Sequence, residues 1–169
     1  MALLSMNEIK ERAQKVELIV LDVDGVLTDG KVTFSSSGDE MVSFDVKDGH
    51  GIVMAIFSGL KIALISGRSS KVTRARAKDL KIEFVYQNVK EKLPKLKELL
   101  EKLNLTLDTV AFVGDDTLDI PPMRAAGLGV AVANAHHAAL AAADWVTSAD
   151  GGKGAVREML DLIMEMRKG

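Results

Sequence analysis

The stretch Val16-Glu-Leu-Ile-Val-Leu-Asp-Val-Asp-Gly25 decides the fold. Its first six residues form a mostly apolar run of strand length, which is typical of a strand buried inside a parallel sheet. Turn residues come directly after this run and carry two carboxylates, Asp22 and Asp24. Because an Asp-x-Asp-Gly turn most often only accepts backbone hydrogen bonds, its meaning depends on the residues at the ends of the other strands.

The rest of the chain alternates between strand-like and helix-like segments, which is the pattern that builds a parallel sheet through crossover helices. Further strands are predicted at 61–65, 83–86, 109–113, 129–133 and 145–147. Helices are predicted at 7–15, after Gly51 to about 58, at 70–80, 92–103, 135–143 and 155–167, with a short one ending near 126. We therefore expect one α/β domain over residues 1–169, a doubly wound, Rossmann-like parallel sheet.

Two β-rich pieces, 31–35 and 41–46, flank turn residues at 36–39 and predict a β-hairpin insert at about 31–46. The segment between Asp24 and Ser66 is long enough for this hairpin but too short for a folded cap domain. We therefore expect no cap domain, so that something else must cover a site at the strand ends.

The composition excludes several classes of function. With 22 Lys and Arg against 24 Asp and Glu, the net charge is −2, so there is no basic excess to bind nucleic acid. The chain has no cysteine, which excludes disulfides, thiolate metal sites and a cysteine nucleophile. Residues 1–6 are too short for a signal peptide, and no apolar run approaches the length of a membrane span. We expect a cytoplasmic protein with no nucleic-acid or membrane partner.

Polar side chains come directly after several of the predicted strands. They are Asp22 and Asp24, Ser66 and Arg68, Lys90 and Lys92, and Asp115, Asp116 and Asp119. In open α/β sheets, ligands bind outside the carboxyl ends of the strands. Carboxylates gathered there repel one another unless a divalent cation neutralises them, and an all-oxygen site suits Mg²⁺ together with a phosphate. The sequence therefore predicts a magnesium and phosphate site at this edge.

Three rival readings of these motifs fail. An EF-hand loop beginning at Asp22 would have Val26 at its fifth position, and a strand in place of the preceding helix. The first strand is not followed by Gly-x-Gly-x-x-Gly, which argues against a dinucleotide site. Ser66 lacks the elbow motif of an acyl-transfer nucleophile. His136 and His137 have no third nitrogen or sulfur ligand and are expected at the surface.

Taken in order, four segments resemble the motifs of the haloacid dehalogenase superfamily of phosphatases. They are 22–26, Ser66, Lys92 and 114–119. The segments 22–30, 48–52, 66–68 and 151–158 are similar to the branch that hydrolyses 3-deoxy-D-manno-octulosonate 8-phosphate in lipopolysaccharide assembly. The resemblance implies that Asp22 attacks phosphorus and forms an aspartyl phosphate, and that Asp24 is the general acid and base.

The resemblance also implies the ligands of the metal and substrate. Asp22, Asp115 and the main-chain carbonyl of Asp24 would bind Mg²⁺, with Asp116 and Asp119 supporting them. Ser66 and Lys92 would hold the phosphoryl oxygens, with Lys90 as the alternative lysine. The substrate contacts would come from Asp24, Asp45, Val46, Lys47, Asp48, Gly49, Arg68, Arg76 and Lys92. Arginine suits them because its fork binds two carboxylate or phosphate oxygens.

Val53 departs from this branch, which usually has a basic residue at that position. A related sugar acid, such as a nonulosonate 9-phosphate, therefore stays open as the substrate. The resemblance further implies a homotetramer in which hairpins associate through Val32, Phe34, Val42 and Phe44, although these residues could instead pack on their own domain.

Two other classes of function stay open. A receiver-type phospho-switch uses a similar set of groups, but its acceptor aspartate lies at the end of a middle strand, whereas Asp22 lies at the end of the first. An inactive relative that serves in regulation or assembly is the other, although every motif position holds a competent residue.

Overall fold

Strand β1 (Leu18–Leu21), with all four residues buried, lies inside a six-stranded parallel sheet. It pairs with β4 (Lys61–Ile65) on one side and with β6 (Val110–Gly114) on the other. The strand order is β5-β4-β1-β6-β7-β8, completed by β5 (Phe84–Tyr86), β7 (Leu128–Ala131) and β8 (Trp145–Val146). The chain runs from β1 out to β5 and then returns to β6, so the strand order reverses beside β1. This confirms the predicted doubly wound fold.

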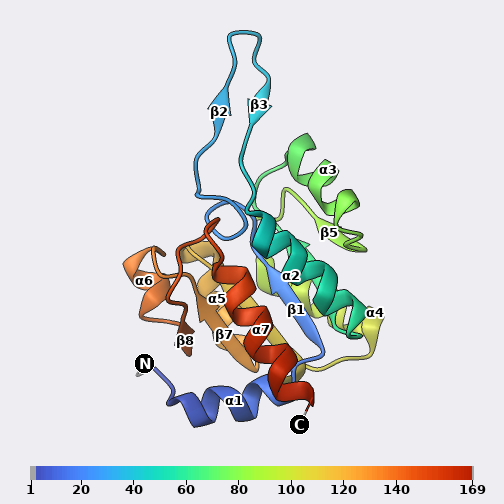
Figure 1. Cartoon of the computed structure of the whole chain (residues 1–169), viewed down its shortest axis with the longest axis vertical. Helices are drawn as coiled ribbons and strands as arrows, with labels where there is room; N and C mark the ends of the chain where they lie inside the picture. Colours follow the sequence, from blue (N-terminus) through green and yellow to red (C-terminus); the bar gives the residue numbers. More distant parts are fainter. Residues whose placement is uncertain (1–2, 169) are drawn as a thin grey trace.

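Helices cover both faces of the sheet (Figure 1). On one face α1 (Met6–Gln14) and α2 (Val46–Phe57) pack against α7 (Ala155–Lys168), while α4 (Lys92–Leu103) and α5 (Ile120–Ala125) pack together on the other. The computed structural model describes residues 3–168, so residues 1, 2 and 169 of the predicted domain lie outside the described part. Within 3–168, no helix has both the length and the apolar character needed to cross a bilayer.

The hairpin exists but is shorter than predicted. Its strands are β2 (Thr33–Phe34) and β3 (Glu40–Met41), and it projects from the sheet at the end where α2 begins (Figure 1). The second predicted strand, 41–46, is confirmed only at Met41. Val46 starts a helix because Asp45 caps it: the Asp45 carboxylate accepts hydrogen bonds from the N–H groups of Lys47 and Asp48. Capping therefore overrides the β-branched and aromatic residues that favour a strand.

Helix α2 consequently begins at Val46, before the two glycines that were expected to precede it. Both glycines serve close packing inside the helix. A Cβ at Gly49 would lie 2.2 Å from Arg76 Nη2, and one at Gly51 would lie 2.8 Å from Arg157 Cδ. The glycines therefore let α2 approach Arg76 and α7 more closely than any other residue would allow.

The remaining helices and strands differ little from the prediction. Helix α3 (Lys71–Asp79) and the other long elements shift by one or two residues, and α4 agrees at both ends. Helix α6 (His137–Leu140) is shorter than the predicted 135–143. Asp144 donates its N–H to the carbonyl of Gly129, and its carboxylate accepts the N–H of Gly129. These two bonds lead the chain into β8 in place of a longer helix. Short 3₁₀ turns occupy Leu107–Thr109 and Thr117–Asp119.

Candidate active site

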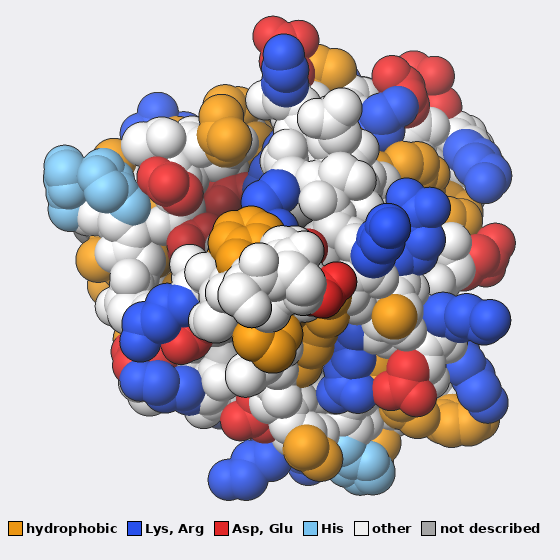
Figure 2. All heavy atoms as spheres, turned by 90° about the horizontal axis from the view of Figure 1, so that it is seen from above, with side chains coloured by type: hydrophobic (Ala, Val, Ile, Leu, Met, Phe, Trp, Pro, Cys, Tyr) orange, Lys and Arg blue, Asp and Glu red, His pale blue; other side chains and the backbone are white. Residues whose placement is uncertain are grey.

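The residues at the ends of β1, β4 and β6 meet at the carboxyl edge of the sheet. They border a cavity of about 240 Å³ lined by Asp22, Asp24, Gly67, Arg68, Lys92, Asp115, Asp116, Leu118 and Asp119. Figure 2 looks onto this end of the molecule and shows acidic side chains recessed beside the projecting hairpin, with basic side chains next to them. The parallel sheet thus brings together segments that are far apart in the sequence.

Lys92 is the buried cation of the site. It is the first residue of α4, its side chain is 3% exposed, and its Nζ lies 2.6 Å from both Asp22 Oδ1 and Asp119 Oδ1. Burial opposes the charge on Lys92, but Asp22 and Asp119 outweigh burial and raise the pKa of the ammonium. Of the two lysines considered from sequence, Lys92 therefore reaches Asp22, whereas Lys90 is exposed.

Three carboxylates gather around this ammonium. One oxygen from each of Asp22, Asp115 and Asp119 lies within 4.8 Å of the others. Burial is the largest influence on the pKa of Asp22 and on that of Asp115. It raises the pKa of Asp22 to about 6, against the opposing effect of Lys92. Burial and then repulsion by Asp22 and Asp119 raise the pKa of Asp115 to about 8. One ammonium does not neutralise three carboxylates, so the cluster fits a divalent cation with oxygen ligands.

Two glycines allow these acids to approach the backbone. Gly25 has φ +92°, and a Cβ there would lie 2.0 Å from Asp115 Oδ2. A Cβ at Gly114 would lie 2.2 Å from Asp119 Cβ, and Asp119 Oδ2 accepts hydrogen bonds from the N–H groups of Asp115 and Asp116. Glycine at these positions therefore fixes the separation of the carboxylates.

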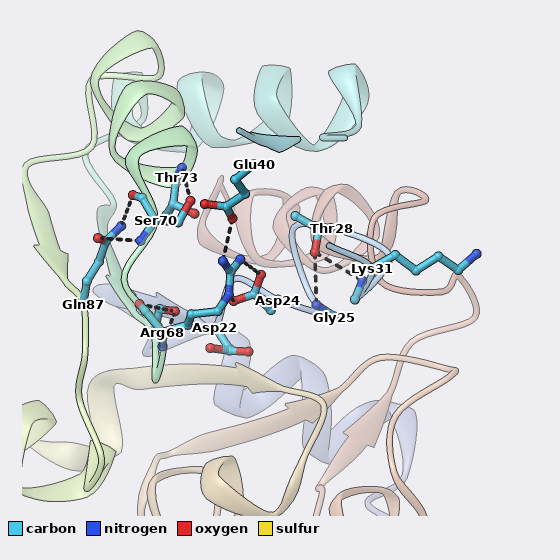
Figure 3. Close-up of polar contacts among 12 residues, drawn as sticks. Asp22, Asp24, Gly25, Thr28, Lys31, Glu40, Arg68, Ser70, Thr73 and Gln87 are labelled. Atoms are coloured by element: carbon cyan, nitrogen blue, oxygen red, sulfur yellow. Dashed lines mark hydrogen bonds and ion pairs between the residues drawn. The ribbon is translucent and has the colours of Figure 1, made fainter. Parts of the chain in front are cut away.

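The Asp24 carboxylate binds Arg68 (Figure 3). Arg68 Nε and Nη2 lie 3.1 and 2.6 Å from the two oxygens of Asp24, which is a bidentate pair. Arg68 Nη1 lies 2.5 Å from Glu40 Oε1 on the hairpin. The hydrogen bonds that Arg68 donates to Asp24 raise the pKa of Arg68, as do those to Glu40, against a smaller opposing effect of burial. The Asp24 side chain is thus outside the carboxylate cluster, and metal binding by its carbonyl stays a prediction.

Ser66 is buried directly after β4. Its hydroxyl accepts a hydrogen bond from Arg68 N and donates one to Arg68 O, both at 3.2 Å. In this conformation the hydroxyl holds the turn that carries Arg68. Its predicted contact with phosphoryl oxygens stays a prediction.

The predicted substrate loop forms the first turn of α2. Val46 is 79% exposed, Lys47 is also exposed, and the Asp45 side chain caps the helix. Asp48 is buried and accepts hydrogen bonds from Gly154 N at 3.3 Å and Arg157 N at 2.7 Å, at the start of α7. Burial raises the pKa of Asp48. Asp45 and Asp48 therefore make structural contacts, and their predicted contact with substrate stays a prediction.

Arg76 lies beside Gly49 on the hairpin side of α3. Its guanidinium carbon is 5.7 Å from the centre of the Phe44 ring, and Nη1 pairs with Asp79 at 2.8 Å. Its Nε is buried and has no hydrogen-bond partner within residues 3–168. Arg76 does not line the cavity around Asp22, so a substrate that contacts both must extend along the base of the hairpin.

Comparisons with known proteins agree with this arrangement. The sequence pattern of the haloacid dehalogenase-like hydrolases matches residues 63–160. The 3-deoxy-D-manno-octulosonate 8-phosphate phosphatase of Escherichia coli BL21-DE3 is 43% identical over 157 residues, which span 93% of this chain and 84% of that protein. This chain belongs to the haloacid dehalogenase-like hydrolases. Membership of this family explains why four separated motifs converge on one edge of the sheet.

Solved structures of other family members are also similar. The enzyme of the same name from Moraxella catarrhalis, in complex with magnesium, phosphate and KDO (3-deoxy-D-manno-octulosonate), is 40% identical with a TM-score of 0.95, over 97% of this chain and 94% of that one. A cobalt-bound deoxy-D-mannose-octulosonate 8-phosphate phosphatase from Haemophilus influenzae is 37% identical with a TM-score of 0.89, over 93% of this chain and 92% of that one. One relative holds magnesium and the other cobalt, and the carboxylate cluster of this chain fits a metal ion of this kind.

Sequence reasoning missed Glu40 and assigned Asp119 only a supporting place. Glu40 belongs to no motif, because its contact with Arg68 exists only once the hairpin has folded and directs this side chain toward the cavity. Asp119 forms part of the acidic motif, but its ion pair with Lys92 depends on where α4 begins.

Proposed function

We propose that this chain is a magnesium-dependent phosphatase that hydrolyses 3-deoxy-D-manno-octulosonate 8-phosphate through a phosphorylated Asp22. The observation that carries the proposal is the position of Asp22, which lies in the cavity with the Lys92 ammonium 2.6 Å away and Asp115 and Asp119 beside it. Relatives with over 40% identity across most of the chain act on that substrate by name, which supports the assignment.

The chemistry is set by the groups around the cavity. An Asp22 oxygen bonds to phosphorus while the bond from phosphorus to the sugar oxygen breaks. Asp24, as general acid, gives a proton to the leaving oxygen and then takes one from the water that releases phosphate from Asp22. Lys92 stabilises negative charge on the phosphoryl oxygens. Mg²⁺ held by Asp22 and Asp115, with Asp119 next to them, supplies further charge neutralisation when bound.

The identity of the sugar acid has one specific rival. Val53 is partly buried on α2 and cannot pair with an acidic group, whereas this branch of the family usually has a basic residue there. A nonulosonate 9-phosphate, which presents its carboxylate at a different distance from phosphorus, is therefore the second candidate substrate.

The hairpin supports a homotetramer. Phe34 and Met41 are 65% and 53% exposed, so the hairpin does not bury them on its own domain, although Phe44 packs against the core. Exposed apolar side chains on a projecting hairpin suit association with other copies, which would also cover the open cavity. By this proposal the enzyme acts in the cytoplasm, in lipopolysaccharide assembly.

The test is phosphate release from a panel of substrates with and without Mg²⁺. The panel holds octulosonate 8-phosphate, a nonulosonate 9-phosphate and simple sugar phosphates, and Asp22→Asn is the control variant. Selective, magnesium-dependent hydrolysis of octulosonate 8-phosphate that is lost in Asp22→Asn is the expected result. Preference for the nonulosonate transfers the assignment to that sugar, and unchanged turnover by Asp22→Asn contradicts the mechanism.

A further inference from the structure

Glu40 differs from the residues around it on the hairpin. It lies on β3 next to the exposed Met41 and opposite the exposed Phe34, yet its own side chain is only 16% exposed. The carboxylate reaches down to the wall of the cavity and ends 2.5 Å from Arg68 Nη1 (Figure 3). Hydrogen bonding to Arg68 is the largest influence on the Glu40 carboxyl and lowers its pKa.

The guanidinium of Arg68 is therefore held on two edges at once. One edge, formed by Nε and Nη2, faces Asp24, while Nη1 faces Glu40. A guanidinium is planar and its donors are fixed relative to one another, so a contact on one edge sets the direction in which the other points. Glu40 thus aims the bidentate edge of Arg68 at the mouth of the cavity that holds Asp24 and Asp22.

We propose that Glu40 is a positioning residue that fixes Arg68 as the group that binds the carboxylate of the sugar acid. This inference rests on the proposed function. On substrate binding, Arg68 exchanges the Asp24 carboxylate for that of the substrate and keeps its contact with Glu40. Asp24 is then released to face the leaving oxygen. Without Glu40, the guanidinium keeps only Asp24 as a side-chain partner and is no longer held in the direction that receives the substrate carboxylate.

A substrate with no carboxylate separates this role from simple anchoring of the hairpin. p-Nitrophenyl phosphate carries the reacting phosphoryl group but no acid for Arg68 to bind. For Glu40→Gln, we expect KM for octulosonate 8-phosphate to rise roughly tenfold, the loss expected of one charge-assisted hydrogen bond. For p-nitrophenyl phosphate we expect kcat/KM to stay within about twofold of the wild type.

Asp39→Asn is the matched control, since it removes one negative charge from the same hairpin. The Asp39 carboxylate accepts hydrogen bonds from the hydroxyls of Ser35 and Ser37. This variant is expected to leave KM and kcat/KM unchanged for both substrates. Glu40→Gln keeps the size of the side chain, so it tests the proposal even where Glu40→Ala disturbs the hairpin.

A double-mutant cycle provides the decisive comparison. If Glu40 acts through Arg68, Glu40→Gln has no further effect on KM in an Arg68→Ala background. Additive effects, or equal losses on both substrates, overturn the proposal. Failure of the proposed function is recognised separately, because it shows in the wild-type enzyme. A wild type that hydrolyses p-nitrophenyl phosphate yet prefers no carboxylate-bearing phosphate overturns both the proposed function and the role of Glu40, before any variant is compared.

Discussion

Lys92 Nζ lies 2.6 Å from Asp22 Oδ1, and the two side chains are only 3% and 8% exposed. The same ammonium bonds Asp119, whose side chain is 1% exposed. A buried charge that loses its partner is strongly destabilising. Asp22, Lys92 and Asp119 therefore form one electrostatic unit, so we expect a change in any of them to affect both stability and activity.

Replacing Lys92 by methionine is expected to leave the buried carboxylates uncompensated. We predict a loss of about 3 kcal/mol in the free energy of unfolding and a fall of about a hundredfold or more in phosphate release. Chemical denaturation and steady-state kinetics measure the two effects. Lys90→Met is the control, since Lys90 is exposed. Greater loss of activity in the Lys90 variant would reverse the assignment of the lysines.

The stability of the metal-free protein is expected to depend on the charge of the cluster. The pKa of Asp22 is raised to about 6 and that of Asp115 to about 8, both above the ordinary 3.8. Their contribution is therefore full below about pH 4 and is lost as the pH rises through these values. Because Mg²⁺ removes the repulsion, it should raise Tm more at about pH 8 than at about pH 5.

Thermal unfolding with Mg²⁺ or with a chelator measures this dependence. Asp115→Asn is the matched variant, because it removes the carboxyl group whose pKa is raised further than that of Asp22 and keeps the shape of the side chain. The metal-free variant should gain stability relative to wild type as the pH rises. Equal magnesium shifts at both pH values, together with parallel pH profiles, would contradict the account of the cluster.

Gly25→Ala is expected to weaken metal binding. The new methyl group would lie 2.0 Å from Asp115 Oδ2, so that carboxylate must move from its place in the cluster. We predict that the magnesium concentration for half-maximal activity rises about tenfold or more. Gly59→Ala is the control: Gly59 has φ +89° but open space around it, so it shares the backbone strain without the collision. Equal effects in both variants would show that strain alone is responsible.

Asp48→Ala is expected to destabilise the junction between α2 and α7. Its buried carboxylate accepts the N–H groups of Gly154 and Arg157, and the loss of both bonds should lower the free energy of unfolding by about 2 kcal/mol. Asp150→Ala, which removes an exposed ion pair with Lys153, should change it little. A stable Asp48 variant with a raised KM would instead favour the contact with substrate predicted from the sequence.

The hairpin is expected to govern assembly. Phe34→Ser removes an exposed apolar side chain from β2, and we predict that the tetramer dissociates in analytical ultracentrifugation. Phe57→Ser is the matched control, since Phe57 is 79% exposed at the end of α2, outside the hairpin. A tetramer that survives in the Phe34 variant but is lost in the Phe57 variant would place the interface on α2.

The fold was predictable where local patterns and burial agree. The apolar run before Asp22 and the alternation after it require a parallel sheet, and the carboxyl edge of that sheet then collects Asp22, Ser66 and Asp115. The strand predicted at 41–46 is present only at Met41, and the capping hydrogen bonds of Asp45 decide that α2 begins at Val46. Glu40 could not be predicted, since its contact joins the hairpin to a loop 28 residues away in sequence.

The most direct test of the central claim is to find the phosphoryl group on the enzyme. Wild-type protein and an Asp22→Asn variant, which lacks the nucleophile, are mixed with octulosonate 8-phosphate and Mg²⁺, quenched in acid within a turnover, digested and analysed by mass spectrometry. We predict one phosphoryl group on the peptide that contains Asp22 in the wild type, and none on the corresponding peptide of the variant. Phosphate release without phosphorylation of that peptide, or with phosphorylation at another residue, would contradict the account.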